Sequence, residues 1–200
     1  ETSRLRGKYI EPYRDGLAYI TCDRDRYSLV LSDRKFRNRR ELISKTPVQL
    51  SCVRVSPDGS MAAFCIKDDR GFTDLALIDL GTLAMTRITD DMSSDTSPAW
   101  LPGGKKIVFV SSRSGTYNLH EYDLETHLLR RITNVTGGLF TPDVSPDGTT
   151  IAVSSYQPGG FRIGIIEYPK KSFDEVVLNP APLGMSFFSD GNRTMDASPP

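Results

Sequence analysis

Short apolar runs recur along the chain at a nearly constant spacing. Their first residues are Leu17, Ala62, Ile107 and Ile151, which lie 45, 45 and 44 positions apart. Each run has four residues, most of them apolar, and follows within a few residues of a turn that contains Gly. Runs of this length between turn residues favour strands over helices. The spacing therefore predicts one strand in each of four repeats.

Each run lies in a longer pattern that predicts three further strands. A turn precedes it, as in Pro57-Asp58-Gly59 and Pro146-Asp147-Gly148, and a strand leads into that turn. Pro presets φ near −65° and Gly accepts a positive φ, so these triplets suit a tight hairpin. A polar loop, a segment of alternating polarity such as 117–123, and an outer strand, more charged in 128–133, follow. In the fourth repeat this outer strand is expected at 175–178. Alternation is typical of a half-buried strand.

Four strands in about 44 residues are the signature of a β-propeller blade, which buries its faces only against neighbouring blades. The sequence thus predicts an all-β fold, a propeller of four-stranded antiparallel blades. Its length provides about four blades and part of another, and we expect a fragment of a larger ring. The predicted repeats are 8–50, 51–94, 95–138 and 139–182, with an insertion and the start of a further blade in 183–200.

The best-formed repeat resembles a known family. Residues 96–109, Thr-Ser-Pro-Ala-Trp-Leu-Pro-Gly-Gly-Lys-Lys-Ile-Val-Phe, and the later Arg130-Arg131-Ile132-Thr133 are similar to the WD40-like propeller repeat of the TolB-like (PD40) family. The similarity extends over about residues 10–178 and implies that 1–200 is one propeller segment.

The resemblance implies a non-enzymatic scaffold for protein–protein interaction in the bacterial envelope, periplasmic or secreted. The implied partner is a protein or peptide at a propeller face, such as a Pal-type lipoprotein, beside the remaining blades or fused domains of the same protein. An alternative is the propeller portion of a larger secreted or periplasmic enzyme, where it gates a peptidase or steers its substrates.

Charge and hydropathy remove two classes of partner from these expectations. The 25 basic and 25 acidic residues cancel, so no electrostatic footprint for nucleic acid exists. The basic run 34–40 has only Phe36 as an aromatic neighbour, and a solvated turn and outer strand explain it better. No run of about 18 apolar residues occurs, so we expect no direct membrane insertion. Residues 1–6 also lack the apolar stretch of a signal peptide.

Candidate catalytic chemistry is sparse. There are two histidines, His120 and His127, and no Gly-x-Ser-x-Gly motif. The acidic loops near Asp23 and Asp69 lack the ligand spacing of a calcium loop, and Arg70 opposes a bound cation. We therefore expect no catalytic residue, no cofactor and no metal within the chain.

Loops that follow the second strand of each repeat are the predicted partner-binding positions. Propeller loops gather at two faces around a central channel, where partners dock. The repeat register places these loops on one face and the Pro-Asp-Gly turns on the other. The candidate residues are Asp23, Arg24, Asp69, Arg70, Arg113, Ser114 and Gly159.

Cys52 and Cys65 flank the predicted turn at Asp58 and Gly59. In a hairpin with a two-residue loop, residues whose numbers sum to 117 face each other, and these cysteines meet that sum. A cross-strand disulfide is conceivable in an oxidising compartment. Free thiols in the blade core are the favoured interpretation, because cross-strand neighbours often lack the required dihedral angle.

Overall fold

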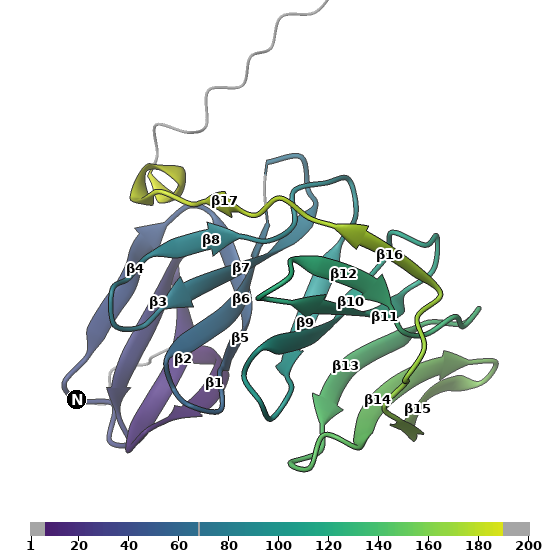
Figure 1. The fold of residues 1–200 in the computed structure, drawn as a ribbon. Coiled ribbons are helices and arrows are strands. Elements are labelled where there is room, and N and C mark those ends of the chain that lie inside the picture. Colours follow the sequence, from purple (N-terminus) through teal and green to yellow (C-terminus); the bar gives the residue numbers. More distant parts are fainter. Residues whose placement is uncertain (1–6, 68, 190–200) are drawn as a thin grey trace, which may run out of the picture.

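Four antiparallel sheets are arranged side by side as the blades of a β-propeller (Figure 1). The computed structural model describes residues 7–67 and 69–189. The predicted all-β propeller fold is confirmed. Within the described ranges the one helix is the short 3₁₀ turn η1 (Met185–Phe188), and no helix there is long and apolar enough to cross a bilayer.

Each sheet begins with an innermost strand, and the chain then moves outward by hairpins. The innermost strands β1, β5, β9 and β13 contact one another in that order. The first sheet comprises β1 (Gly7–Tyr13), β2 (Gly16–Asp23), β3 (Arg26–Asp33) and β4 (Arg40–Thr46). The second comprises β5 (Gln49–Val55), β6 (Met61–Lys67), β7 (Thr73–Asp79), β8 (Met85–Arg87) and β17 (Ala181–Pro182). The third comprises β9 (Asp95–Trp100), β10 (Lys106–Ser111), β11 (Asn118–Asp123), β12 (Leu128–Arg131) and β16 (Asp174–Val177). The fourth comprises β13 (Leu139–Val144), β14 (Thr150–Gln157) and β15 (Gly160–Glu167).

The Pro-Asp-Gly turns form as predicted. In the second sheet the amide of Gly59 donates to the carbonyl of Ser56 at 2.9 Å, and Gly59 has a φ of 69°. The Asp58 carboxylate accepts the amide of Ser60 at 3.0 Å, which closes the turn. Successive turns also meet, since a Cβ on Gly148 would lie 3.3 Å from the ring of Pro102. The turns thus gather at one face of the propeller.

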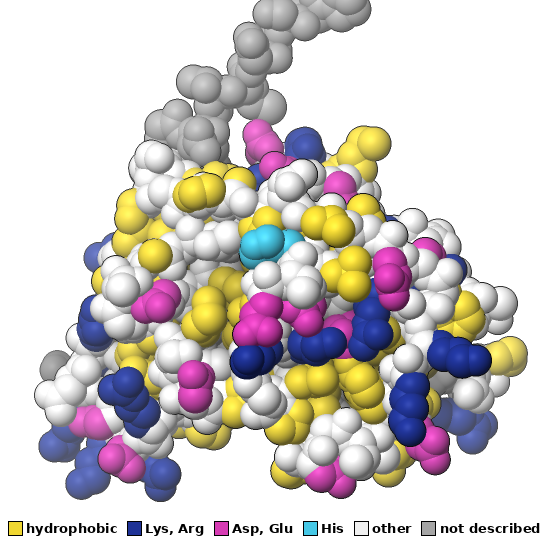
Figure 2. Space-filling model, in the orientation of Figure 1, with side chains coloured by type: hydrophobic (Ala, Val, Ile, Leu, Met, Phe, Trp, Pro, Cys, Tyr) yellow, Lys and Arg dark blue, Asp and Glu magenta, His cyan; other side chains and the backbone are white. Residues whose placement is uncertain are grey.

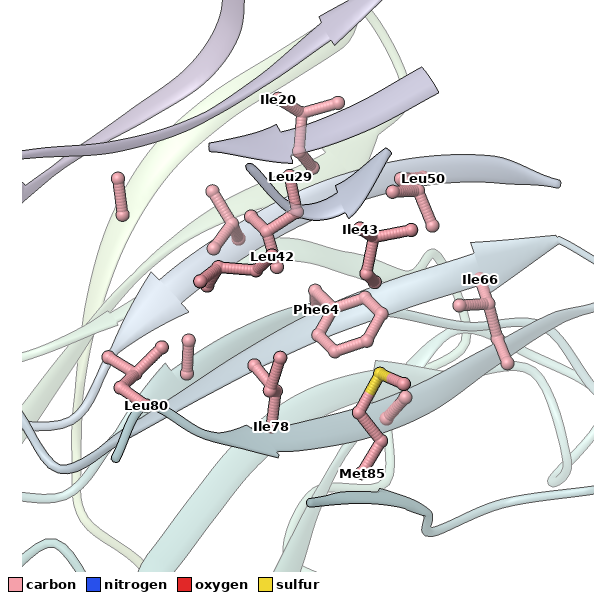
Figure 3. Packing of buried hydrophobic residues seen from close by; sticks show 14 of the residues in the cluster. Ile20, Leu29, Leu42, Ile43, Leu50, Phe64, Ile66, Ile78, Leu80 and Met85 are labelled. Carbon is pink, nitrogen blue, oxygen red and sulfur yellow. The ribbon is translucent and has the colours of Figure 1, made fainter. Parts of the chain in front are cut away.

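Apolar side chains fill the spaces between neighbouring sheets. Phe64 of β6 is fully buried and occupies the middle of the cluster between the first two sheets, with Ile43 and Met85 around it (Figure 3). Equivalent clusters lie between the second and third sheets, around Phe109, and between the third and fourth, around Ile151. Each sheet therefore depends on its neighbour for a core, as the repeat pattern predicts.

One predicted strand pairs differently from expectation. The sequence suggests that residues 175–178 form the outer strand of the fourth repeat, but β16 instead pairs antiparallel with β12 of the third sheet. Opposite charges lie across this pair, with Glu175 facing Arg130 and Asp174 facing Arg131. The Arg131 guanidinium contacts the Asp174 carboxylate at 2.9 Å. Cross-strand charge pairing favours this edge, and the fourth sheet is left with three strands.

Beyond β16 the chain follows the outer edges of the sheets back toward the first one (Figure 1). β17 pairs with β8, and the amide of Leu183 donates to the carbonyl of Met85 at 2.9 Å. Leu183 and Phe188 are buried in the cluster between the first two sheets. Residues 174–188 therefore form a belt along the outer edges of three sheets, and the described part of the predicted insertion, 183–189, is the end of that belt on the first two sheets. The predicted start of a further blade, Asp196–Pro200, lies outside the described residues.

Candidate functional site

The innermost strand of every sheet carries a β-bulge at the same repeat position. In each case two residues oppose one residue of the second strand, and the first of the two has a positive φ. Such bulges turn side chains and often lie beside functional sites. The bulged pairs are Tyr9-Ile10, Cys52-Val53, Ser97-Pro98 and Thr141-Pro142, opposite Tyr19, Phe64, Phe109 and Val153 respectively.

The first residue of each bulge lies in the left-handed region that favours glycine. The φ angles are 54° for Tyr9, 54° for Cys52, 53° for Ser97 and 46° for Thr141. This conformation is costly for residues with a Cβ, most of all for a β-branched one such as Thr141. Backbone strain of this kind gathers at ligand-binding and active sites. Its repetition in four strands marks the channel as the candidate site.

A pocket of about 150 Å³ lies where the four innermost strands meet. We call it the channel pocket. All four strained residues line it, and its exposed surface is mostly apolar. An apolar pocket with a few converging polar groups is the usual form of a binding site. The lining residues are Tyr9, Glu11, Cys52, Val53, Arg54, Ser97, Pro98, Thr141 and Pro142.

Three charged side chains converge at this pocket. Arg54 contacts Glu11 at 3.0 Å and Asp143 at 3.9 Å, so its guanidinium joins the first, second and fourth sheets. The three residues hold equivalent positions, each two residues after a strained bulge residue. Burial raises the pKa of Glu11, and the Arg54 guanidinium opposes that rise. The backbone carbonyl of Arg54 also accepts the indole N–H of Trp100 at 3.0 Å, which fixes the strand that presents the guanidinium.

The predicted loop residues lie apart from the channel pocket. Arg70 and Arg113 both form ion pairs with the segment that joins β8 to β9. Arg70 contacts Asp90 at 2.9 Å, and Arg113 contacts Asp91 at 3.4 Å. Ser114 bonds within its own loop, where its hydroxyl donates to the carbonyl of Thr116 at 3.1 Å. The remaining predicted residues are exposed at hairpin ends: Asp23, Arg24, Asp69 and Gly159.

Neither histidine is paired with a nucleophile. His120 is buried, donates from Nδ1 to the carbonyl of Asn118 at 3.3 Å and packs beside Phe109. His127 is bonded through Nδ1 to the Tyr122 hydroxyl at 2.8 Å. Across residues 7–67 and 69–189, no group of three or more His, Cys, Asp or Glu side chains gathers where a metal ion could bind.

Stability at mildly acidic pH is expected to depend on His120. Burial, together with the nearby Arg113 guanidinium, lowers its pKa from 6.5 to about 4. As pH falls from 6.5 to 4, the unfolded chain takes up a proton there while the folded chain does not. The free energy of unfolding should therefore fall by about 3 kcal/mol over that range. Urea titrations at several pH values should show this loss in the wild type and in His127→Gln, but not in His120→Leu. Equal pH dependence in all three proteins would contradict the assignment.

The two cysteines of the second sheet are free thiols. Near the turn the register is the predicted one, because Arg54 faces Ala63 and the two numbers sum to 117. The bulge at Cys52 then shifts the pairing by one residue, so that Ser51 faces Cys65. The direct cross-strand placement of Cys52 and Cys65 is therefore wrong, and the two cysteines are instead diagonal neighbours on the paired strands.

Of the residues that line the channel pocket, the sequence singles out Cys52 alone, and as a candidate for a disulfide rather than for binding. A signal for it does exist, since Cys52, Ser97 and Thr141 are spaced by 45 and 44 residues, the period of the repeat itself. Two of these residues precede a proline, which is found in strands at bulges or edges. Bulge geometry depends on the pairing of two strands, and spacing alone does not reveal it.

Comparison with solved structures agrees with the fold. TolB from Acinetobacter baumannii matches with a TM-score of 0.67 and 23% identity, over 77% of this chain and 38% of that one. The putative TolB from Agrobacterium tumefaciens matches with a TM-score of 0.69 and 20% identity, over 82% of this chain and 62% of that one.

Two curated relatives each match about half of this chain. An uncharacterised protein of Agrobacterium fabrum is 30% identical over 106 residues, which are 53% of this chain and 36% of that protein. Dipeptidyl-peptidase 5 of Porphyromonas gingivalis is 30% identical over 104 residues, 48% of this chain and 15% of that protein. The chain thus spans a minor part of each relative. The family model of the TolB beta propeller domain (PD40) matches residues 9–181, and the chain belongs to this family.

Proposed function

We propose that this chain is a non-catalytic propeller segment that binds a segment of a partner protein at the channel pocket. The observation that supports this most directly is the convergence of four strained bulges on one pocket. Side chains held there by strained backbone are preorganised, so less conformational freedom is lost when a partner binds.

The chemistry of the pocket fits an extended peptide. Tyr9, Pro98 and Pro142 provide apolar surface for a side chain, while Arg54 and Glu11 provide opposite charges for polar groups of the peptide. Few charged groups on an apolar wall give orientation and specificity. A single small metabolite would use the same pocket, but the joining of three sheets by Arg54 suits a ligand that reaches along the channel.

The proposed setting follows the family. A Pal-type lipoprotein is the candidate partner, and the bacterial periplasm or the outside of the cell is the candidate location. The remaining blades of the same protein are the other proposed partner, packed on the fourth sheet.

Arg54→Ala is expected to weaken partner binding about tenfold, equivalent to about 1.4 kcal/mol. The side chain is the one cationic group among the pocket-lining residues, and its loss leaves Glu11 without its partner. Calorimetric titration of the purified chain with the soluble domain of a Pal-type lipoprotein measures the effect. An array of extended peptides, probed with the same protein, measures it independently of that partner.

Arg24→Ala is the matched control, because Arg24 is an exposed arginine on the predicted loop face. It should leave binding unchanged. The opposite result, with binding lost in Arg24→Ala and kept in Arg54→Ala, would move the site to the loop face. Absence of binding to both the lipoprotein and the peptide array would contradict the scaffold proposal.

A second candidate is the propeller portion of a larger enzyme that gates or steers substrates for a peptidase domain. The similarity to dipeptidyl-peptidase 5 favours it. The complete reading frame distinguishes the two, since a serine hydrolase motif downstream supports the enzyme and an upstream TolB-like domain supports the scaffold. In either case we propose that catalysis takes place outside this chain.

A further inference from the structure

Cys52 and Cys65 lie on adjacent strands of the second sheet but differ in access. Cys65 of β6 is fully buried. Cys52 is the first residue of the β5 bulge, is half-buried, and lines the channel pocket. The bulge thus brings the Cys52 thiol to the pocket, while Cys65 lies on the paired strand opposite Ser51, so the two cysteines are diagonal neighbours across the strand pair.

Several donors surround the Cys52 sulfur. The Cys65 thiol is the most important, and the backbone of Ser97 and the hydroxyls of Ser51 and Ser97 also contribute. These hydrogen bonds lower the pKa of Cys52 to about 6, against the opposing effect of burial. The same contact and burial raise the pKa of Cys65. Of the two thiols, Cys52 therefore forms the thiolate more readily, and the thiolate is the nucleophilic form.

We propose that Cys52 and Cys65 are a redox-responsive pair, which hydrogen peroxide entering the channel pocket converts into a cross-strand disulfide. A small oxidant can reach the Cys52 sulfur from the channel pocket, because this half-buried residue lines it. The complete burial of Cys65 keeps it from meeting an oxidant directly and leaves it the resolving role.

The reaction has two steps. The Cys52 thiolate attacks one oxygen of hydrogen peroxide, the O–O bond breaks, and Cys52 becomes a sulfenic acid while hydroxide leaves. Hydroxide takes the Cys65 proton and becomes water. The Cys65 sulfur then attacks the Cys52 sulfur, the S–O bond breaks, and the departing oxygen leaves as a second water after protonation by solvent. The two sulfurs lose two electrons in total, and the peroxide is reduced to two waters.

The third cysteine is an internal control. Cys22 lies on β2 of the first sheet, is half-buried like Cys52, and does not line the channel pocket. The pair model assigns the reaction to Cys52 and Cys65 alone, and it does not depend on the identity of the binding partner.

The test uses the reduced 200-residue chain, treated with one equivalent of hydrogen peroxide at pH 7, alkylated and analysed by mass spectrometry. We expect a loss of two hydrogens and one linked peptide that joins Cys52 to Cys65. Oxidation of Cys52 should be about tenfold faster than that of Cys22. Without peroxide, alkylation of Cys52 by iodoacetamide should be half-maximal near pH 6.

Variants separate the two roles. Cys65→Ser should stop at a sulfenic acid on Cys52, trapped by dimedone, whereas Cys52→Ser should leave Cys65 reduced and Cys22→Ser should behave as wild type. Faster oxidation of Cys22, linkage between molecules, or a persistent sulfenic acid in the wild type would overturn the proposal. Because these three outcomes are measured on the wild type, the test holds even where a variant fails to fold.

Discussion

Arg130→Met is expected to lower the free energy of unfolding by about 3 kcal/mol, because it leaves a buried carboxylate without its main partner. The carboxylate of Glu121 on β11 is 1% exposed, whereas the Arg130 side chain is 20% exposed. Arg130 donates to both carboxylate oxygens, from Nε at 2.8 Å and from Nη2 at 3.0 Å. Basic and acidic side chains also gather near the centre of the face shown in Figure 2.

Two further variants give the controls for this prediction. Lys106 also contacts Glu121, at 3.0 Å, but its side chain is 35% exposed and its removal leaves the bidentate pair intact. Lys106→Met should therefore cost about 1 kcal/mol or less. The double variant Glu121→Leu with Arg130→Met should recover most of the loss, since replacement of a whole buried pair by apolar residues is often neutral. Urea unfolding at pH 7 measures all three. A loss below about 1 kcal/mol in Arg130→Met would contradict the account.

The repeat period and the turns could be predicted from the sequence because they depend on neighbouring residues. Pro57, Asp58 and Gly59 suffice to form a tight turn, and the apolar run after it must become the second strand of a sheet. The same local pattern appears in the third and fourth repeats, around Gly104 and Gly148, and the structure confirms it in each.

The position of β16 could not be predicted in this way. Its repeat position indicates the outer edge of the fourth sheet, and its pairing with β12 depends on the charges of Arg130 and Arg131, which lie more than 40 residues earlier. The position of the segment after β16 also depends on distant residues, since Leu183 and Phe188 enter a cluster formed by residues of the first two sheets. Contacts between distant segments decide both cases.

In the candidate site, too, features set by neighbouring residues could be predicted and features set by distant contacts could not. The loops that carry Arg70 and Arg113 were found from the repeat register, because a loop position follows from strand order. The channel pocket depends on where four innermost strands meet and on bulges at Cys52, Ser97 and Thr141, which the one-dimensional pattern does not show. The register error at Cys65 has the same origin, a bulge of one residue within a strand whose ends were correctly placed.

The outward face of the fourth sheet is the remaining feature with a large expected effect. Strand pairing puts alternate residues of β14 and β15 on the face away from the third sheet, with Tyr156 opposite Phe161. On that face Ile163 is 88% exposed and Ile165 is 74% exposed. The equivalent face of the third sheet, around Val108 and Val110, is fully buried against the fourth. We call this surface the open face: Tyr156, Phe161, Ile163 and Ile165.

A further sheet of the same propeller is the cover that the repeat predicts for the open face. Each of the first three sheets buries its outward face against the next, and the sequence begins a similar motif at Asp196. Contiguous apolar surface of this kind marks an interaction site or a tendency to aggregate. Within residues 7–67 and 69–189 no sheet packs on the open face, so the purified 200-residue chain is expected to self-associate at micromolar concentration.

Ile163→Glu combined with Ile165→Glu should weaken this self-association at least 100-fold. Burial of one isoleucine is worth about 1.5–3 kcal/mol, and each 1.4 kcal/mol changes the dissociation constant tenfold. Sedimentation equilibrium measures the effect.

Met92→Glu is the matched control, because Met92 is equally exposed but lies in the segment between β8 and β9, away from the open face. If the wild-type chain stays monomeric at about 100 µM, the open face needs no cover and the expectation is wrong. Association that survives the double variant but not Met92→Glu would move the contact to the loop face. A chain extended through the next complete repeat should be monomeric without any substitution, because the added sheet supplies the same apolar contacts within one molecule.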